Sequence, residues 1–222
     1  GWTLDDITCV DPDSGSSDGG STATIDLDDG ETVTCTFSNS LDTGTIIIVK
    51  EATPADDTPF PFTEDIPGAN SGFTLMDPSD NTETFNDVPT GSYSVTESAV
   101  AGWDVANLVC DDLNSTGIIN TATAIINLEK DETVTCTFTN DKLAGKIVIV
   151  KEATPADDTV FTFTEDIPGA ASGFTLSDPS DNTETFSEIP LGSYQVSEVV
   201  PAGWSLDDID CIDPDGGTTT AL

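Results

Sequence analysis

The chain has 222 residues, of which 42 are Asp or Glu and 5 are Lys or Arg, giving a formal net charge of −37 at pH 7. Such a surface repels phosphate backbones and anionic lipid headgroups, which excludes nucleic acid and membrane surfaces as expected partners and favours cations. No apolar run approaches the roughly 20 residues of a transmembrane helix, so we expect no membrane span. Apolar residues make up 36% of the chain. Their regular alternation favours a folded core over disorder.

An internal repeat of 101 residues organises the sequence. Residues 50–58 are identical to residues 151–159, and a long fixed period of this kind indicates tandem copies of one module. The same spacing relates residues of several types: Trp2, Trp103 and Trp204; Cys9, Cys110 and Cys211; Cys35 and Cys136; Lys50 and Lys151.

The phase of the repeat divides the chain into three parts. We expect residues 1–40 to be the C-terminal part of a preceding unit, residues 44–140 a complete unit, and residues 145–222 the N-terminal part of a following unit. A window on a longer array is the favoured interpretation, and strand exchange between the incomplete ends of neighbouring molecules is the alternative. The short joint at residues 141–145 predicts units stacked as a stiff rod.

The elements of the complete unit are all predicted to be β-strands, because alternation at period two runs throughout and no helical stripe of about 10 residues occurs. Clusters of Pro, Gly, Asp and Asn between them favour turns. This pattern is typical of an Ig-like β-sandwich, so the predicted fold class is all-β, as tandem sandwich repeats. In chain order, the expected strands cover residues 45–51, 60–63, 72–76, 82–86, 92–98, 104–110, 121–128 and 132–139.

The sequence carries none of the usual catalytic motifs. It has no His, no Gly-x-Ser-x-Gly turn and no phosphate-binding Gly loop. Neighbouring carboxylates are so frequent in an acidic chain that they do not indicate a glycosidase. We therefore expect no enzyme activity.

The cysteines recur at long spacing. Cys9 is followed by Cys35, and Cys110 by Cys136, whereas Cys211 has no partner later in the sequence. This spacing differs from the Cys-x-x-Cys of zinc and redox sites and predicts structural disulfides formed in an oxidising, extracellular compartment. Buried free thiols are the alternative.

Acidic turns are candidate Ca²⁺ sites, and Ca²⁺ is the one cofactor that we consider. Aspartates that alternate near a glycine supply the oxygen ligands that Ca²⁺ prefers. A solvated acidic loop is the alternative. The middle copy departs from the pattern and instead has Asn114-Ser115-Thr116, an acceptor motif for N-glycosylation. The candidate ligands are Asp11, Asp13 and Asp18 in the first copy and Asp213 and Asp215 in the last.

Three polar residues interrupt the apolar faces of three separate strands. Lys50 shares the apolar face of the first strand, Glu97 that of a middle strand and Asn140 that of the last strand. Side chains on one face of a strand point the same way, so the three residues of a unit are predicted to meet in the core. The same parity recurs in the neighbouring copies at Lys151, Glu198 and Asn39.

At these positions the sequence resembles the Cna B-type or SpaA-like prealbumin-fold domains of microbial surface proteins. The resemblance rests on a first strand ending in Lys (145–151), a Gly-x-Tyr-x-Val-x-Glu stretch (91–97) and a last strand ending in Asn (135–140). It implies a seven-stranded sandwich in which Lys50 and Asn140 join in a spontaneous isopeptide bond assisted by Glu97. An ordinary buried ion pair capped by Asn140 is the alternative.

These features predict a structural repeat of an extracellular stalk, fibre or pilus-like filament on a bacterial or archaeal surface, whose partners are neighbouring repeats or copies of itself. The rival hypothesis is an adhesin that binds a glycan or a host protein. Letter-identical loops favour the shaft, because a binding tip diversifies its loops. Three Gly-Trp pairs could serve as sugar platforms, but each Trp begins an alternating strand, which favours core packing.

Overall fold

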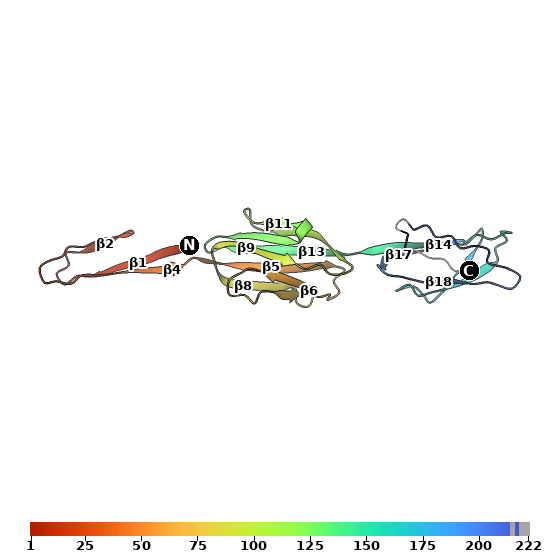
Figure 1. The fold of residues 1–222 in the computed structure, drawn as a ribbon, viewed down its shortest axis with the longest axis horizontal. Coiled ribbons are helices and arrows are strands. Elements are labelled where there is room, and N and C mark those ends of the chain that lie inside the picture. Colours follow the sequence, from red (N-terminus) through yellow and green to blue (C-terminus); the bar gives the residue numbers. More distant parts are fainter. Residues whose placement is uncertain (214–215, 218–222) are drawn as a thin grey trace. The chain divides into compact units, whose positions relative to one another are not determined.

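The structure is a computed structural model that describes residues 1–213 and 216–217. The chain forms two compact units, Gly1–Lys142 and Leu143–Leu222, built of β-strands (Figure 1). In the described part of the chain the one helical element is the 3₁₀ turn Ile119–Thr121, and no helix has the length and hydropathy to cross a bilayer. The predicted all-β fold class is confirmed.

A sandwich of two sheets forms the centre of the first unit. One sheet has the strand order β10-β13-β5-β8, in which β13 and β5 are parallel and the other pairs are antiparallel. The second sheet has the order β11-β12-β9-β6-β7 and is antiparallel. The first sheet consists of β10 (Trp103–Cys110), β13 (Thr133–Lys142), β5 (Thr43–Thr53) and β8 (Thr82–Pro89). The second consists of β11 (Thr116–Ile118), β12 (Thr123–Leu128), β9 (Gly91–Glu97), β6 (Phe60–Glu64) and β7 (Phe73–Leu75).

The strands differ most from the prediction at two places. The expected strand 121–128 begins only at Thr123, because the 3₁₀ turn precedes it, and β11 comes before that turn. The expected joint 141–145 is almost entirely strand, since β13 continues to Lys142 and β14 (Ala144–Val150) follows after one residue.

The core lies between the two sheets. In β5 every second residue is buried, and the opposite face is partly open to solvent, which matches the period-two pattern of the sequence. Aromatic side chains fill the middle, with the ring of Phe62 stacked on Phe73 and edge-on to Phe138. The buried set is Ile46, Ile48, Ala52, Phe60, Phe62, Ile66, Leu75, Val88, Val95, Trp103, Leu108, Ala124, Ile126, Leu128, Val134, Cys136 and Phe138.

The segment before the sandwich is an antiparallel hairpin of β1 and β4, with a small second pair, β2 and β3, in its connection. The strand bounds are β1 (Trp2–Val10), β2 (Ser17–Gly19), β3 (Thr22–Thr24) and β4 (Thr34–Leu41). Among the described strands, β4 pairs only with β1.

The second unit repeats the first half of the sandwich. β14 pairs with β17, and β15 pairs with both β16 and β18. Its smaller core is centred on Phe161, Phe163 and Leu176. The strands after β14 are β15 (Val160–Glu165), β16 (Phe174–Ser177), β17 (Thr183–Pro190) and β18 (Val196–Val199).

Candidate functional site

Lys50, Glu97 and Asn140 meet inside the central sandwich. Lys50 comes from β5 and Asn140 from the parallel neighbour β13, while Glu97 is the last residue of β9 in the facing sheet. The parallel register places Phe138 beside Lys50, so Asn140 lies two residues further along, on the same face. The parity of the three strands thus brings the predicted residues together.

The three side chains form one connected group. The Nζ of Lys50 donates a hydrogen bond to Oδ1 of Asn140 at 2.9 Å, and Nδ2 of Asn140 donates to Oε1 of Glu97 at 2.5 Å. Lys50 Nζ lies 3.9 Å from Oε2 of Glu97. Two backbone carbonyls, those of Glu51 and Phe138, accept the remaining hydrogen bonds of the amine, at 2.6 and 3.3 Å. The Asn140 amide therefore bridges the amine and the carboxyl group.

This group is removed from water. Lys50 is 0%, Asn140 2% and Glu97 4% exposed, and the amine lies 4.0 Å from the centre of the Phe60 ring. Burial lowers the pKa of Lys50 to about 8, although the nearby Glu97 charge opposes the shift. Burial also raises the pKa of Glu97, against the effects of Lys50 and Asn140. Both shifts favour the uncharged forms of an amine and a carboxylic acid.

A cavity of about 330 Å³ adjoins the group. Glu97 and Asn140 contribute to its wall, together with Trp103 and Ile119. Two members of the buried group, Glu97 and Asn140, thus border this cavity.

The second unit holds two members of the equivalent set. The Nζ of Lys151 lies 3.1 Å from Oε2 of Glu198 and 4.2 Å from the centre of the Phe161 ring, as Lys50 lies over Phe60. Asn39, which was predicted together with Lys151 and Glu198, belongs to the hairpin and is exposed on β4. The structure therefore does not place Asn39 with a Lys and a Glu.

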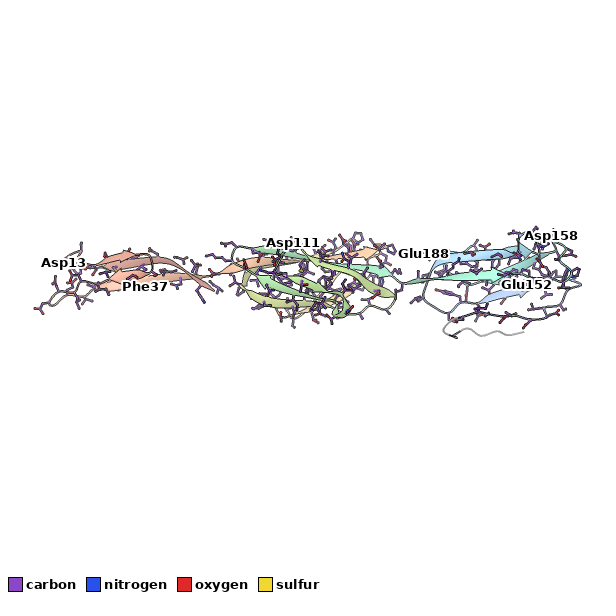
Figure 2. All side chains as sticks on the ribbon, turned by 90° about the horizontal axis from the view of Figure 1, so that it is seen from above. Asp13, Phe37, Asp111, Glu152, Asp158 and Glu188 are labelled. Carbon is purple, nitrogen blue, oxygen red and sulfur yellow. A yellow bond between two sulfur atoms is a disulfide. The ribbon has the colours of Figure 1, made fainter. Side chains whose placement is uncertain are left out.

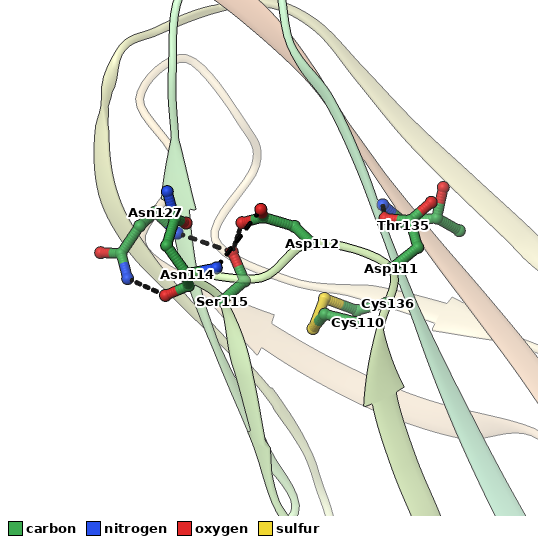
Figure 3. The surroundings of a disulfide bond; sticks show 8 residues. All are labelled: Cys110, Asp111, Asp112, Asn114, Ser115, Asn127, Thr135 and Cys136. Atoms are coloured by element: carbon green, nitrogen blue, oxygen red, sulfur yellow. Dashed lines mark hydrogen bonds between the residues drawn. A yellow bond between two sulfur atoms is a disulfide. The ribbon is translucent and has the colours of Figure 1, made fainter.

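Two disulfides connect neighbouring strands. Cys9 is bonded to Cys35 between β1 and β4, and Cys110 to Cys136 between β10 and β13 (Figure 3). Each closes a loop with a sequence separation of 26. Cys211 is exposed and free.

The acidic residues of the first copy gather only in part. Oxygens of Asp11, Asp13 and Glu31 lie within 4.8 Å of one another in the connection of the hairpin, whose tip carries Asp13 (Figure 2). Asp18 is not a member of this cluster; it pairs with Ala23 across β2 and β3. In the last copy, Asp213 is described and Asp215 lies outside the described residues.

Glu31 was not expected from the sequence. The pairing of Cys9 with Cys35 sets the register of the hairpin and brings the residues after β1 opposite those before β4. Hydrogen bonding from Ser16 holds the pKa of Asp11 below its usual value. Contact with Asp28 raises the pKa of Asp13. The backbone N–H of Asp28 lowers the pKa of Glu31, but Asp11, burial and Asp13 together outweigh this effect and raise that pKa.

In the middle copy an amide replaces one of the three carboxylates. Asn114 is the counterpart of Asp13, and its Nδ2 donates to Oε1 of Glu129 at 3.2 Å. Its loop is held by Ser115, whose hydroxyl donates to Asp112 at 2.6 Å and accepts from the backbone N–H of Asn127 (Figure 3). Asn114 is exposed, as a glycosylated residue has to be, and its modification stays a prediction.

The three Gly-Trp pairs have different surroundings. Trp103 is buried with its ring edge-on to Phe60, and Trp204 packs in the same way on Phe161. Trp2 is 67% exposed. Gly102, the residue before Trp103, has φ of +82°, a left-handed conformation that residues with a side chain rarely adopt. In the central unit the tryptophan is a core residue, so its ring is not available there as a platform for binding a sugar.

The chain belongs to the SpaA_4 family, described as a prealbumin-like fold domain. The family profile matches residues 1–41, 46–142 and 147–222. The resemblance to SpaA-like prealbumin-fold domains is thereby confirmed. No curated protein matches the sequence significantly.

Several solved structures of bacterial proteins are similar in fold. The Bacillus anthracis TIE protein is 17% identical with a TM-score of 0.43, and the match covers 81% of this chain and 34% of that one. The major pilin T-13 of Streptococcus pyogenes is 16% identical with a TM-score of 0.45, covering 75% and 85%. A B repeat unit of the Staphylococcus aureus collagen-binding surface protein Cna is 14% identical with a TM-score of 0.24, covering 73% and 88%. The chain spans only 34% and 56% of the anthrax protein and of a streptococcal ancillary pilin.

Proposed function

We propose that this chain is a structural segment of an extracellular stalk or pilus-like filament, and that its central unit forms an isopeptide bond between Lys50 and Asn140. The observation that supports the bond is the buried contact of Lys50 Nζ with the Asn140 amide, beside Glu97. An inert side-chain amide becomes reactive when the amine is held against it, because positioning replaces a bimolecular encounter.

The reaction needs an uncharged amine. Burial lowers the pKa of Lys50 to about 8, so a substantial fraction of its amine is neutral near physiological pH. The Nζ lone pair attacks Cγ of Asn140, a new N–C bond forms, the bond from Cγ to Nδ2 breaks, and ammonia leaves. Oxidation states do not change.

Glu97 transfers the protons. Its raised pKa favours the protonated carboxyl group, which can polarise the amide and deliver a proton to the departing Nδ2 that it contacts. The resulting carboxylate, whose Oε2 lies 3.9 Å from Nζ, then takes up the proton that the attacking amine loses. The adjoining cavity, which Glu97 and Asn140 both line, offers the ammonia a space to enter.

The filament role is favoured over an adhesin. A bond from β5 to β13 joins the strand through which the chain enters the sandwich to the strand through which it leaves. Residues 50–58 recur letter for letter at 151–159, which suits identical stacked units better than a diversified binding tip. Electron microscopy separates the two: long filaments support the shaft, and short rods attached to glycans or cells support the adhesin.

Intact-mass measurement tests the bond. The wild-type chain is expected to be lighter by one ammonia than its sequence mass with two disulfides, because the central unit forms one amide. Glu97→Ala is expected to restore the full mass, while Glu51→Ala, a change to an exposed neighbour of Lys50, retains the loss. A wild-type chain at full mass would show that Lys50 and Glu97 form only an ion pair.

We also propose that Asp11, Asp13 and Glu31 bind a Ca²⁺ ion. Carboxylates this close repel one another, and a cation relieves the repulsion. Binding to the folded hairpin adds about 2.7 kcal/mol of stability when free Ca²⁺ exceeds the Kd a hundredfold.

Calorimetric titration is expected to show Ca²⁺ binding that chelator reverses. Asp13→Asn, which copies the Asn114 of the middle unit, is expected to abolish the binding heat, and Asp18→Asn is expected to preserve it because Asp18 lies outside the cluster. Absence of a heat for the wild-type chain at fixed ionic strength contradicts the site.

A further inference from the structure

The loop that follows β10 differs from its counterparts at neighbouring positions. It reads Asp-Leu-Asn-Ser-Thr at 112–116, whereas the other copies read Asp-Pro-Asp-Ser-Gly at 11–15 and Asp-Pro-Asp-Gly-Gly at 213–217. Asn114 and Thr116 are the two residues that an N-glycosylation acceptor requires, and they stand where the other copies have Asp and Gly. Either residue alone would leave no acceptor sequence. The middle copy therefore differs from both others by the complete acceptor.

The two acceptor side chains both face solvent. Asn114 and Thr116 are exposed, while Ser115 between them is half-buried. Figure 3 shows how Ser115 holds the loop: its hydroxyl donates to Asp112 at 2.6 Å and accepts the backbone N–H of Asn127 at 3.0 Å. Because the anchoring residue is the one between them, both acceptor side chains stay on the outside of the unit.

The Nδ2 atom of Asn114 can be modified without loss of the loop's anchors. It donates to Oε1 of Glu129 at 3.2 Å, and both of these side chains are exposed. A hydrogen bond between exposed groups contributes little, because water competes for both partners. The backbone carbonyl of Asn114 is held separately, by Nδ2 of Asn127 at 2.6 Å. A sugar on the Asn114 side chain therefore replaces one N–H and leaves this backbone contact in place.

The tip of the loop has room for a bulky group. Leu113, directly before the acceptor asparagine, is 105% exposed, so no protein atoms cover its side chain. The other copies have Pro12 and Pro214 at this position. A sugar chain is bulky and belongs on the surface, and it meets no steric obstacle beside Leu113.

We propose that Asn114 carries an N-linked glycan, at the position where the first copy has Asp13 of its proposed cation site. In the transfer, Nδ2 of Asn114 loses one proton to the solvent and forms a bond to C1 of a sugar. The bond from C1 to the phosphate of a lipid-linked sugar donor breaks, and the phosphate leaves with the lipid. No group is oxidised or reduced. The inference rests on the extracellular role proposed above, because this modification is made on secreted chains.

The glycan-bearing loop and the cation loop share one scaffold. Glu132 is the counterpart of Glu31. Its Oε2 accepts the backbone N–H of Glu129 at 2.7 Å, as Oε2 of Glu31 accepts that of Asp28 at 2.9 Å. The strand connection thus keeps its fold while one carboxylate becomes an amide. Neighbouring copies would then differ in what their equivalent loops carry, a metal ion in one and a neutral or charged sugar chain in the next.

Mass spectrometry of the full chain tests the proposal, on protein from the cells that make it and from a secreting host that performs N-glycosylation. The wild-type chain is expected to gain the mass of one sugar chain, located on the peptide that contains Asn114. Asn114→Gln and Thr116→Ala are each expected to lose the whole gain. Thr116→Ser keeps the acceptor hydroxyl and is expected to retain it. Asn107→Gln changes an exposed asparagine outside any acceptor sequence and is the control, expected to match the wild-type chain.

The outcomes separate this inference from the proposed function. An unmodified wild-type chain overturns the glycan, and modification in the foreign host alone overturns it as well, because the native cells then leave the acceptor unused. A gain that persists in Asn114→Gln belongs to another residue and overturns the assignment. The same spectrum reports the ammonia loss of the central unit. A glycan on a polypeptide of full mass therefore supports this inference and contradicts the isopeptide bond, and the reverse result does the opposite.

Discussion

Asn140→Ala is expected to let the central sandwich extend under force, whereas the wild-type sandwich is expected to stay closed. Tension enters at the start of β5 and leaves at the end of β13, and the proposed bond would pass it from Lys50 directly to Asn140. The proposed bond would enclose 90 residues, and the Cys110–Cys136 disulfide already closes a loop of 26 of them. Removing the Lys50–Asn140 bond is therefore expected to release about 220 Å of extended chain.

Single-molecule force spectroscopy measures this length. In Asn140→Ala the additional step is expected to grow to about 310 Å after reduction, since the full 90 residues become free. Asn127→Ala is a matched control, because Asn127 lies in the same sandwich but outside the buried group and should give the wild-type trace. A wild-type chain that shows the same long step as Asn140→Ala rules out the covalent route for tension.

Replacing Cys110 and Cys136 together by alanine is expected to destabilise the central sandwich by roughly 3.5 kcal/mol, because a loop of this size gains that much conformational freedom in the unfolded chain. The Cys110–Cys136 disulfide also joins the edge strand β10 to β13, the strand that carries Asn140. Chemical denaturation of the double variant and the wild-type chain measures the difference.

Cys211→Ala is the control for this variant. Its thiol is exposed and free, so its removal is expected to leave the denaturation midpoint unchanged. Thiol labelling of denatured, unreduced wild-type chain should modify Cys211 alone. Stoichiometric labelling at Cys110 or Cys136 would refute the pairing.

The meeting of the three buried polar residues could be predicted from the sequence, because it depends only on which face of each strand they occupy. Lys50, Glu97 and Asn140 lie on faces whose other members are apolar, and in a two-sheet sandwich such faces meet. Distances were not predictable, since they depend on the parallel register of β13 and β5, which no local pattern specifies.

The acidic site was less predictable. Asp11 and Asp13 are close in sequence, but Glu31 comes near them only through the fold of the hairpin. Asp18 lies outside the cluster, in the β2–β3 strand pair. The strand β11 was missed because it is short and has Gly117 at its centre, where a Cβ atom would collide with the carbonyl of Leu108. Close approach of two backbones leaves no hydrophobic signal in the sequence.

The parallel pairing of β5 and β13 also decides how the sandwich fails if the covalent bond is missing. Tension applied at the start of one strand and the end of its parallel neighbour slides the two past each other. All the rungs of the ladder, from Thr45 with Thr133 to Thr53 with Asp141, then share the load and break together. An antiparallel pair pulled from adjacent ends would open like a zipper, one rung at a time. Shear resistance is thus built into the order of the strands, independently of any chemistry between their side chains.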